Sequence, residues 1–204
     1  MKILITGGTG FIGRYLVKNL NKKYPNSNIL ILIRKSFKDN IKKEYDGNKN
    51  IEFVYDMDIS KYDEIEPYFE NIDYVFHLAA TKKTSKKFSK EIFETNVIGT
   101  KNVIGASIKH KVKNFVFASS GSVYGVKEEE QVTEDLSLIP ISNYNKTKMI
   151  SERVLLSYKD YINTQCIRPA TVCGYSPRMR FDVSVNMLTM QALTNKKITV
   201  FGGK

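Results

Sequence analysis

A glycine loop near the start of the chain constrains its fold more than any other segment. An apolar run from Ile3 to Ile5 leads directly into glycines at Gly7, Gly10 and Gly13, and a helical pattern follows at once. Glycines permit a tight turn and a close approach of backbone to ligand. The helix behind them presents free N–H groups and the positive end of its dipole, which favour a pyrophosphate. The segment therefore predicts a dinucleotide-binding unit; a tight turn without a ligand is the alternative.

Apolar runs alternate with helical patterns along the rest of the chain. We expect strands at 2–6, 28–34, 51–55, 72–78, 113–118 and 162–168. We expect helices at 11–23, 61–70, 88–110 and 142–159, with loops at 35–50, which includes a weak helix, and at 126–140. Nearly continuous hydrophobicity, as at 29–33, is typical of strands buried on both faces. The alternation predicts an α/β fold with a Rossmann-type doubly wound parallel sheet.

Composition limits the partners and the compartment. The 204 residues include 32 Lys and Arg against 21 Asp and Glu, a net charge of +11. The lysines are scattered, so a solvated surface that favours anionic substrates is preferred to nucleic-acid binding. Cys166 and Cys173 lack metal-ligand spacing and indicate a reduced, intracellular protein. Because no membrane-spanning run or signal peptide is apparent, we expect a cytoplasmic protein without nucleic-acid, membrane or metal partners.

Two strand ends supply candidates for binding the adenosine half of a dinucleotide. An acid after the second strand normally binds the ribose 2′-hydroxyl of NAD, but Arg34, Lys35 and Ser36 occupy this region. Such a cluster favours a 2′-phosphate, so NADP is slightly preferred and the choice between NAD and NADP stays open. Asp58 can accept from the adenine amino group while Ile59 packs on the ring. A turn aspartate before a helix is the equal alternative.

The end of the fourth strand offers a surface for the cofactor. Leu78, Ala79 and Ala80 follow His77 there. Small residues at this edge let a cofactor lie across the sheet, so we assign these three to the cofactor site. We expect His77 to be a packed or linking histidine rather than a base.

A second group of candidate functional residues consists of Ser120, Tyr144 and Lys148. The Y-x-x-x-K spacing places Tyr144 and Lys148 on one face of a helix. A nearby ammonium lowers the pKa of a tyrosine because it favours the phenolate. Tyr144 can then exchange a proton with a substrate oxygen during hydride transfer to or from a nicotinamide. Ser120 follows a strand and can orient the same oxygen. The spacing alone arises easily by chance, but it gains specificity beside the glycine loop.

Six segments in order resemble one known family. They are the glycine loop at 7–13, His-Leu-Ala-Ala at 77–80, Asn-Val-Ile-Gly-Thr-Lys-Asn at 96–102, Ser-Ser-Gly-Ser-Val-Tyr-Gly at 119–125, Y-x-x-x-K at 144–148 and Arg-Pro-Ala-Thr-Val-Cys-Gly at 168–174. Together they resemble the extended short-chain dehydrogenase/reductase family, in its NAD-dependent epimerase/dehydratase branch, whose members mostly act on nucleotide-activated sugars. The resemblance implies that Tyr144 is the catalytic base, Lys148 a ribose ligand and pKa modifier, and Ser120 a hydroxyl donor.

The resemblance also implies further site residues and a homodimer. It adds Phe11, Ile12 and Asn96 to the cofactor site, with Asn96 supporting the site rather than doing chemistry. It implies substrate contacts from Ser122, Arg178 and Asn186. Helices at 88–110 and 142–159 resemble those of a four-helix dimer interface. Ile92, Val103 and Ile150 would fit that interface, with core packing as the equal alternative.

Departures from the family pattern narrow the expected reaction. Gly121 and Ser122 stand where 4,6-dehydratases have Asp-Glu, so elimination of water loses its general acid and base. A nucleotide-sugar epimerase, 4-oxidase or 4-reductase remains. Cys173 replaces the usual Tyr, and we expect a small packed residue rather than a catalytic thiol.

The family pattern breaks off within its C-terminal part. We therefore expect a fragment, with residues 1–175 forming the NAD(P)-binding Rossmann domain and 176–204 an incomplete substrate-binding region. In this region Arg178 and Arg180 supply cations for a diphosphate. A non-catalytic dinucleotide-binding module or an inactive fragment is the alternative from another functional class.

Overall fold

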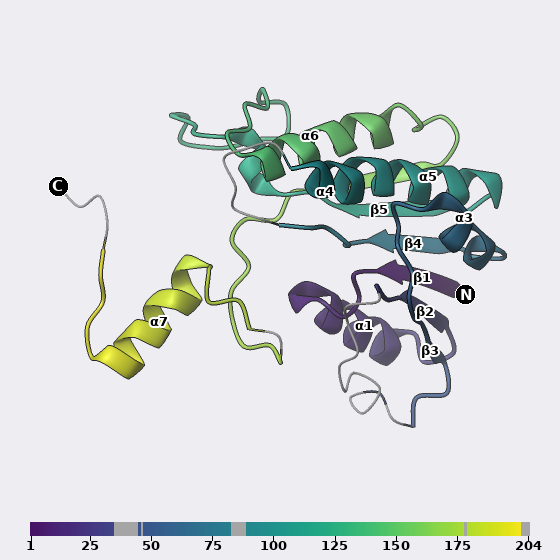
Figure 1. Cartoon of the computed structure of the whole chain (residues 1–204), viewed down its shortest axis with the longest axis horizontal. Coiled ribbons are helices and arrows are strands. Elements are labelled where there is room, and N and C mark those ends of the chain that lie inside the picture. The colour runs from purple at the N-terminus through teal and green to yellow at the C-terminus, as the bar shows by residue number, and fades with distance from the viewer. Residues whose placement is uncertain (35–44, 46, 83–88, 178, 201–204) are drawn as a thin grey trace.

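A parallel sheet with helices on both faces forms the body of the protein (Figure 1). The computed structural model describes residues 1–34, 45, 47–82, 89–177 and 179–200. Within these ranges the strands are β1 (Lys2–Thr6), β2 (Asn28–Leu32), β3 (Ile51–Val54), β4 (Tyr74–His77), β5 (Asn114–Ala118) and β6 (Asn163–Ile167). Their order is β3-β2-β1-β4-β5-β6, and every neighbouring pair is parallel. The predicted doubly wound α/β class is confirmed. The order reverses between β1 and β4, where such sheets bind ligands.

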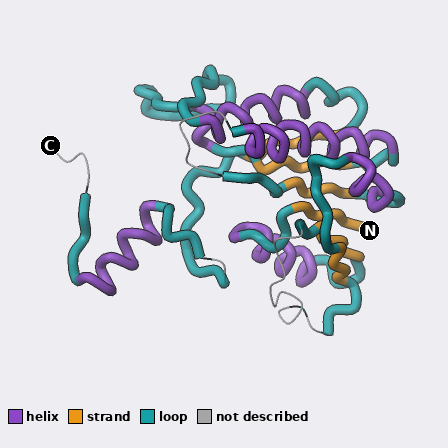
Figure 2. Tube along the Cα trace, in the orientation of Figure 1, coloured by secondary structure: helices purple, strands orange, loops and turns teal. Residues whose placement is uncertain are grey.

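The helices lie in two layers (Figure 2). Helix α1 (Phe11–Lys23) covers one face, and α3 (Tyr62–Ile65), α4 (Lys90–Phe93), α5 (Gly99–Lys109) and α6 (Asn143–Leu156) cover the other. The expected helix at 61–70 is α3 followed by a 3₁₀ turn, η1 (Glu66–Phe69). Pro67 lies at the start of this turn and has no N–H to continue the α-helical ladder. The weak helix expected within 35–50 lies largely outside the described residues.

The long helix expected at 88–110 contains a change of hydrogen-bond pattern. Between α4 and α5 runs a π-helical turn, η2 (Glu94–Ile98). Such turns are rare and occur mostly as single turns inside α-helices. The Asn96 carbonyl within this turn accepts hydrogen bonds from two side-chain hydroxyls, those of Thr100 and Ser151.

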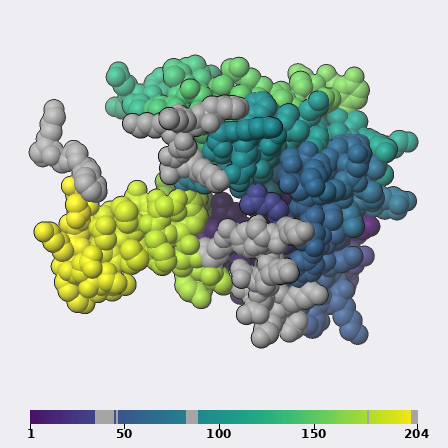
Figure 3. Space-filling model, in the orientation of Figure 1, coloured from purple at the N-terminus to yellow at the C-terminus, as the bar shows by residue number. Residues whose placement is uncertain are grey.

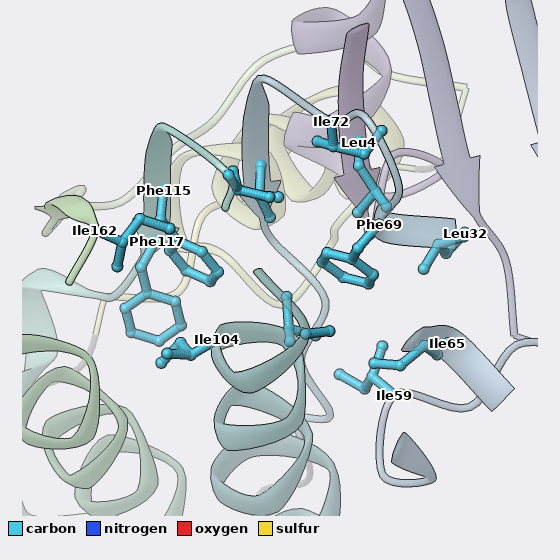
Figure 4. Packing of buried hydrophobic residues seen from close by; sticks show 14 of the residues in the cluster. Leu4, Leu32, Ile59, Ile65, Phe69, Ile72, Ile104, Phe115, Phe117 and Ile162 are labelled. Carbon is cyan, nitrogen blue, oxygen red and sulfur yellow. The ribbon is translucent and has the colours of Figure 1, made fainter. Parts of the chain in front are cut away.

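Two apolar clusters hold the layers together. The larger cluster lies between the sheet and helices α3, α5 and α6 and includes Leu4, Phe69 and Phe115 (Figure 4). The smaller cluster lies under α1 and includes Ile5 and Ile31. Inner strands β1 and β2 are buried on both faces, as their apolar runs predicted. The outer strand β6 alternates between exposed and half-buried residues because it has a neighbour on one side only.

The segment after β6 extends away from the sheet (Figure 3). Its helix α7 (Ser184–Asn195) buries Asn186, while Val185, Leu193 and Val200 are exposed. The expected division at residue 175 stays a prediction. In the part of the chain that the structure describes, none of the helices has the length and apolar character needed to cross a membrane.

Candidate functional site

The glycine loop joins the end of β1 to α1 through a turn that requires its glycines. Gly7 has a φ of +73°, a conformation that favours glycine. The Gly10 N–H donates to the Gly7 oxygen at 3.0 Å. A Cβ on Gly13 would lie 2.2 Å from the Gly7 oxygen, and one on Gly7 would lie 2.6 Å from the Ala79 nitrogen. The loop is therefore tight and lies directly against the end of β4.

The N-terminus of α1 fits a diphosphate. Gly10 is its N-cap, and among the described residues no side chain caps this end. The first turn has no acid, so the positive end of the dipole is not neutralised there. Arg14 is buried behind the loop, with Nε donating to the Thr9 oxygen at 3.0 Å. Phe11 is buried and Ile12 is exposed. Free N–H groups and a buried cation favour a phosphate-bearing ligand at this point.

The end of β4 completes the edge beside the glycine loop. The Leu78 N–H donates to the Thr6 oxygen at 3.0 Å, and the Ala79 N–H to Thr6 Oγ1 at 3.3 Å. Leu78 and Ala79 are half-buried and Ala80 is exposed. The three residues assigned to the cofactor site thus lie at the crossing point of the sheet.

The adenosine-side candidates are further along the same edge. Arg34 is exposed just after β2, while Lys35 and Ser36 lie outside the described residues. Asp58 Oδ1 accepts from the Ser60 N–H at 2.9 Å and from Ser60 Oγ at 2.8 Å, which is the geometry of the turn-aspartate alternative.

Ile59 lies in the core. It is 7% exposed. A Cβ on Gly99 would come within 2.7 Å of Ile59 Cγ1, so the side chain packs tightly on α5. The packing of Ile59 on an adenine ring stays a prediction.

Asn96 joins three parts of the site. Its Oδ1 accepts from the Thr81 N–H at 2.8 Å, and its Nδ2 donates to Thr147 Oγ1 at 3.0 Å. Its carbonyl oxygen, in the π-helical turn, accepts from Thr100 Oγ1 at 2.6 Å and from Ser151 Oγ at 2.7 Å. Asn96 thus ties the loop after β4 to α5 and α6, which is consistent with a supporting role.

His77 is a buried linking histidine. Its ring pairs with Thr6 Oγ1 at 2.6 Å and with Thr100 Oγ1 at 2.9 Å. The side chain is fully enclosed, and burial followed by the charge of Lys148 lowers the pKa of His77 to about 3. It is therefore neutral at physiological pH, as a packed histidine should be.

Helix α6 delivers Lys148 to the end of β5. Its Nζ donates to the Ala118 oxygen at 2.7 Å and lies 4.5 Å from the Phe117 ring centroid. The same atom is 6.0 Å from the Tyr144 ring centroid. Lys148 is 2% exposed, and burial lowers its pKa to about 7. The lysine is thus held between α6 and the strand that leads to Ser120.

The pKa of Tyr144 departs from the sequence-based expectation. Burial raises it, and the charge that opposes this effect belongs to Arg180. The Lys148 amine faces Ala118 instead, and its own low pKa weakens its effect on the phenol. Arg180 is therefore a cation near Tyr144 whose position sequence reasoning did not anticipate.

Ser120 begins the turn after β5. A series of side-chain hydrogen bonds links it to the start of α6. It caps the 3₁₀ turn η3 (Gly121–Tyr124). Its Oγ lies 2.7 Å from Ser122 Oγ, which donates to Asn145 Oδ1 at 2.7 Å. Asn145 follows Tyr144 directly. The structure thus brings Ser120, Tyr144 and Lys148 to the same sheet edge, while their catalytic roles stay predictions.

The predicted substrate residues are less closely grouped. Asn186 Oδ1 accepts from the Gly174 N–H at 2.9 Å, and its Nδ2 donates to the Arg180 oxygen at 3.0 Å. Its amide thus organises the loop before α7. Arg178 lies outside the described residues. Cys173 is exposed, so the expectation of a packed residue there is wrong.

An ion-pair cluster links the C-terminal segment to the loop after β4. Arg180 donates to both Asp182 oxygens, at 3.0 and 2.6 Å, and Lys82 Nζ lies 3.3 Å from Asp182 Oδ2. These contacts hold Arg180 beside the site. Among the described residues, no three His, Cys, Asp or Glu side chains gather where they could hold a metal ion.

The residues suggested for a dimer interface are mostly core residues. Ile92 is 1% exposed and Val103 is fully buried, whereas Ile150 is half-buried. Core packing, the alternative interpretation, is therefore correct for the first two. Both lie on the helix side that packs against the rest of the domain.

Sequence reasoning missed several residues that hold the site. Thr147, one turn beyond Tyr144, bonds to Asn96. Glu152, which is buried, and Arg168, which is half-buried, form an ion pair behind Lys148. The four-residue spacing of Lys148 and Glu152 on a predicted helix was a readable signal. The pairing with Arg168 depends on the fold and had no sequence signal.

Comparisons with known proteins agree with this geometry. The model of the family "NAD dependent epimerase/dehydratase family" matches residues 3–204. The uncharacterized UDP-glucose epimerase YtcB of Bacillus subtilis (strain 168) is 30% identical over 210 residues, covering 99% of this chain and 66% of its own length.

Two solved structures of a Bacillus cereus enzyme are also similar. UDP-glucuronic acid 4-epimerase in complex with NAD is 31% identical with a TM-score of 0.85, covering 99% of this chain and 66% of the other. Its complex with UDP-glucuronic acid and NAD is 30% identical with a TM-score of 0.83 and the same coverage. The chain thus spans slightly less than two thirds of these relatives. With the fold, the glycine loop and the family match in agreement, the chain belongs to the NAD-dependent epimerase/dehydratase family.

Proposed function

We propose that this chain is the cofactor-binding and catalytic part of a nucleotide-sugar epimerase or 4-oxidoreductase that uses NAD or NADP. The observation that carries the proposal is the 2.7 Å bond from Lys148 Nζ to the Ala118 oxygen. This bond packs the helix of Tyr144 against the strand end that leads to Ser120, at the edge where the glycine loop lies. NAD in the B. cereus complexes supports NAD as the first cofactor to test.

The glycine loop and the residues at the end of β4 would hold the dinucleotide. A bound nicotinamide dinucleotide supplies the acceptor and donor of hydride for such a reaction. Tyr144 takes the proton from the sugar 4-hydroxyl and returns it to the keto oxygen. Ser120 orients that oxygen by a hydrogen bond, and Lys148 adds a ribose contact and positive charge near the phenol.

The turn after Ser120 favours hydride chemistry without dehydration. Gly121 packs on the next strand end: a Cβ there would lie 3.1 Å from the Pro169 oxygen. An acid at this position would need the neighbour to shift. Ser122 is exposed and bonded to Asn145. The turn therefore lacks the acid pair that water elimination needs.

The proposal extends to the substrate region, the assembly and the compartment. Residues from 176 onward form the beginning of the nucleotide-sugar site, and Arg180 supplies a cation whose charge acts on the phenol of Tyr144. The protein acts as a homodimer that pairs helices α5 and α6 with those of a second copy. Its two free cysteines fit a reducing cytoplasm.

The test is turnover by the natural full-length protein. UDP-, GDP-, dTDP- and CDP-sugars are offered with NAD or NADP, and products are followed by NMR and by nicotinamide absorbance. We expect turnover of a nucleotide sugar, loss of that turnover in Tyr144→Phe with NAD affinity largely unchanged, and normal turnover in the control Tyr158→Phe. Full activity of Tyr144→Phe would overturn the catalytic assignment. NAD binding without turnover of any sugar would favour the non-catalytic module.

A further inference from the structure

An ion pair between a buried carboxylate and a half-buried guanidinium lies behind the proposed site. Glu152 of α6 is 1% exposed. Arg168, just after β6, donates from Nε to Glu152 Oε1 at 3.0 Å and from NH2 to Oε2 at 2.8 Å. Removing the Glu152 charge from water is costly, and the attraction to a partner such as Arg168 often does little more than offset that cost. Stability alone therefore gives a weak reason for this pair.

One end of the pair faces Lys148. Glu152 follows Lys148 by four residues, so both lie on one face of α6. Burial lowers the pKa of Lys148, and the charge that opposes this effect most strongly is that of Glu152. The carboxylate therefore favours the ammonium form of the lysine.

Three other titratable groups near Lys148, those of His77, Cys166 and Tyr144, are neutral near pH 7. Burial lowers the pKa of His77 on β4 to about 3 and raises that of Cys166 on β6 to about 12. Tyr144 on α6 has a raised pKa and stays a phenol. Arg168 is a cation, and it already pairs with Glu152. Among these described groups, Glu152 is the one that carries negative charge.

The other end of the pair reaches the Ser120 turn. Arg168 NH1 donates to Tyr124 Oη at 2.7 Å, and its guanidinium lies 4.9 Å from the Tyr124 ring centroid. Tyr124 ends the 3₁₀ turn that Ser120 caps. The backbone beside Arg168 holds the same turn, because the Gly121 N–H donates to the Pro169 oxygen at 2.8 Å. One ion pair therefore connects α6 with the turn that carries Ser120.

We propose that Glu152 and Arg168 are positioning residues: Glu152 is the buried counter-charge of Lys148, and Arg168 connects the same ion pair to the turn that begins at Ser120. The inference rests on the proposed function, in which Lys148 and Ser120 act on the substrate and cofactor. Neither Glu152 nor Arg168 needs to touch the reacting atoms. Their effect is on the charge of Lys148 and on the order of the turn.

The first test measures the charge of Lys148 without any turnover. The full chain is labelled with ¹³C-lysine, the Lys148 Cε resonance is assigned by its loss in Lys148→Met, and its titration midpoint is followed by NMR. Glu152→Gln keeps the shape and removes the charge, so we expect the midpoint to fall by about one pH unit. The control Glu134→Gln removes an exposed carboxylate from the loop whose backbone oxygen accepts from Arg168, and should leave the midpoint in place.

Two results would overturn this part of the proposal: an unmoved midpoint in folded Glu152→Gln, or an equal shift in Glu134→Gln. Should Glu152→Gln fail to fold, Glu152→Asp replaces it. Its shorter side chain keeps a charge but withdraws it from Lys148, so a smaller fall is expected and no fall overturns the proposal. The titration does not depend on turnover, so it stands or fails separately from the proposed enzyme activity.

The second test follows the Ser120 turn by amide hydrogen exchange. Tyr124→Phe removes the bond from Arg168 but no charge. We expect faster exchange at the Gly121 amide, with the Lys148 midpoint unchanged. Arg168→Lys keeps a positive charge but lacks the planar guanidinium with its several donors. It should also speed exchange at the Gly121 amide. Unchanged exchange in both variants would show that Arg168 does not position the turn.

Discussion

Asn96 Nδ2 donates a 3.0 Å hydrogen bond to Thr147 Oγ1, which joins the π-helical turn η2 to the helix that carries Tyr144 and Lys148. The same hydroxyl donates to the Tyr144 oxygen at 2.7 Å. Thr147 is 6% exposed, so water cannot easily replace either bond. The first turn of α6 is therefore fixed from outside the helix as well as from within.

Thr147→Val should lower the free energy of unfolding by about 1–3 kcal/mol, because it leaves the buried Asn96 amide with one donor unpaired. Thr147→Ser keeps the hydroxyl and should lose much less. Thr194→Val is the control, since Thr194 is exposed and its Oγ1 bonds only within α7 among the contacts described. Urea denaturation measures all three. Equal losses in Thr147→Val and Thr147→Ser would contradict the role given to the hydroxyl.

Gly13→Ala should disrupt both the fold of the loop and its binding of NAD. The added Cβ would lie 2.2 Å from the Gly7 oxygen and 2.7 Å from the Gly8 Cα. Both neighbours are backbone atoms, so relief requires moving the loop, at a cost of about 3 kcal/mol.

Gly105→Ala is the matched control for this change. Gly105 lies within α5, and its added Cβ would meet a Tyr62 ring atom at 3.6 Å, an ordinary contact. This variant should be neutral or more stable by up to about 1 kcal/mol, with NAD affinity unchanged. Thermal unfolding and NAD titration compare the two. The steric argument would be refuted if the Gly13→Ala and Gly105→Ala proteins had the same stability and the same affinity for NAD.

Local patterns predicted the sheet well, because each buried strand has its own apolar run. The π-helical turn was missed, since Glu94–Ile98 carries the same apolar spacing as the α-helix around it. Sequence patterns were least informative where a side chain's surroundings depend on distant segments. Ile59 is enclosed by α5, and Arg180 approaches Tyr144 only because the chain after β6 turns back towards the loop after β4. Sequence spacing alone contains no information on such contacts.

Lys148→Met should abolish turnover while raising stability near neutral pH. Burial lowers the pKa of Lys148 from 10.5 to about 7, so the folded state binds fewer protons than the unfolded state between these values. The free energy of unfolding of the wild type should therefore rise with pH across this window, with a slope of up to about 1.4 kcal/mol per unit.

The methionine variant lacks this dependence. Its free energy of unfolding should exceed that of the wild type most at pH 7, and the difference should shrink towards pH 10. Chemical denaturation at a series of pH values provides the measurement, and Lys146→Met on the exposed side of α6 is the control. An advantage that grows with pH would show that the sign of the shift is wrong.

His77 should make the protein sensitive to acid. Its pKa is about 3 in the folded state against 6.5 for a free histidine, so the folded state stays neutral while the unfolded state takes up a proton as the pH falls. The stabilising contribution is thus complete above pH 6.5 and is lost progressively down to about pH 3, at up to about 1.4 kcal/mol per unit.

His77→Gln loses ring contacts with Thr6 and Thr100 and should be less stable at pH 7. Because it lacks the titrating group, the gap between the wild type and this variant should narrow as the pH falls from 6.5 to 4. Carboxylates titrate equally in both proteins and cancel in the difference. A gap that stays constant over this range would mean that His77 is protonated in the folded state as readily as in the unfolded one.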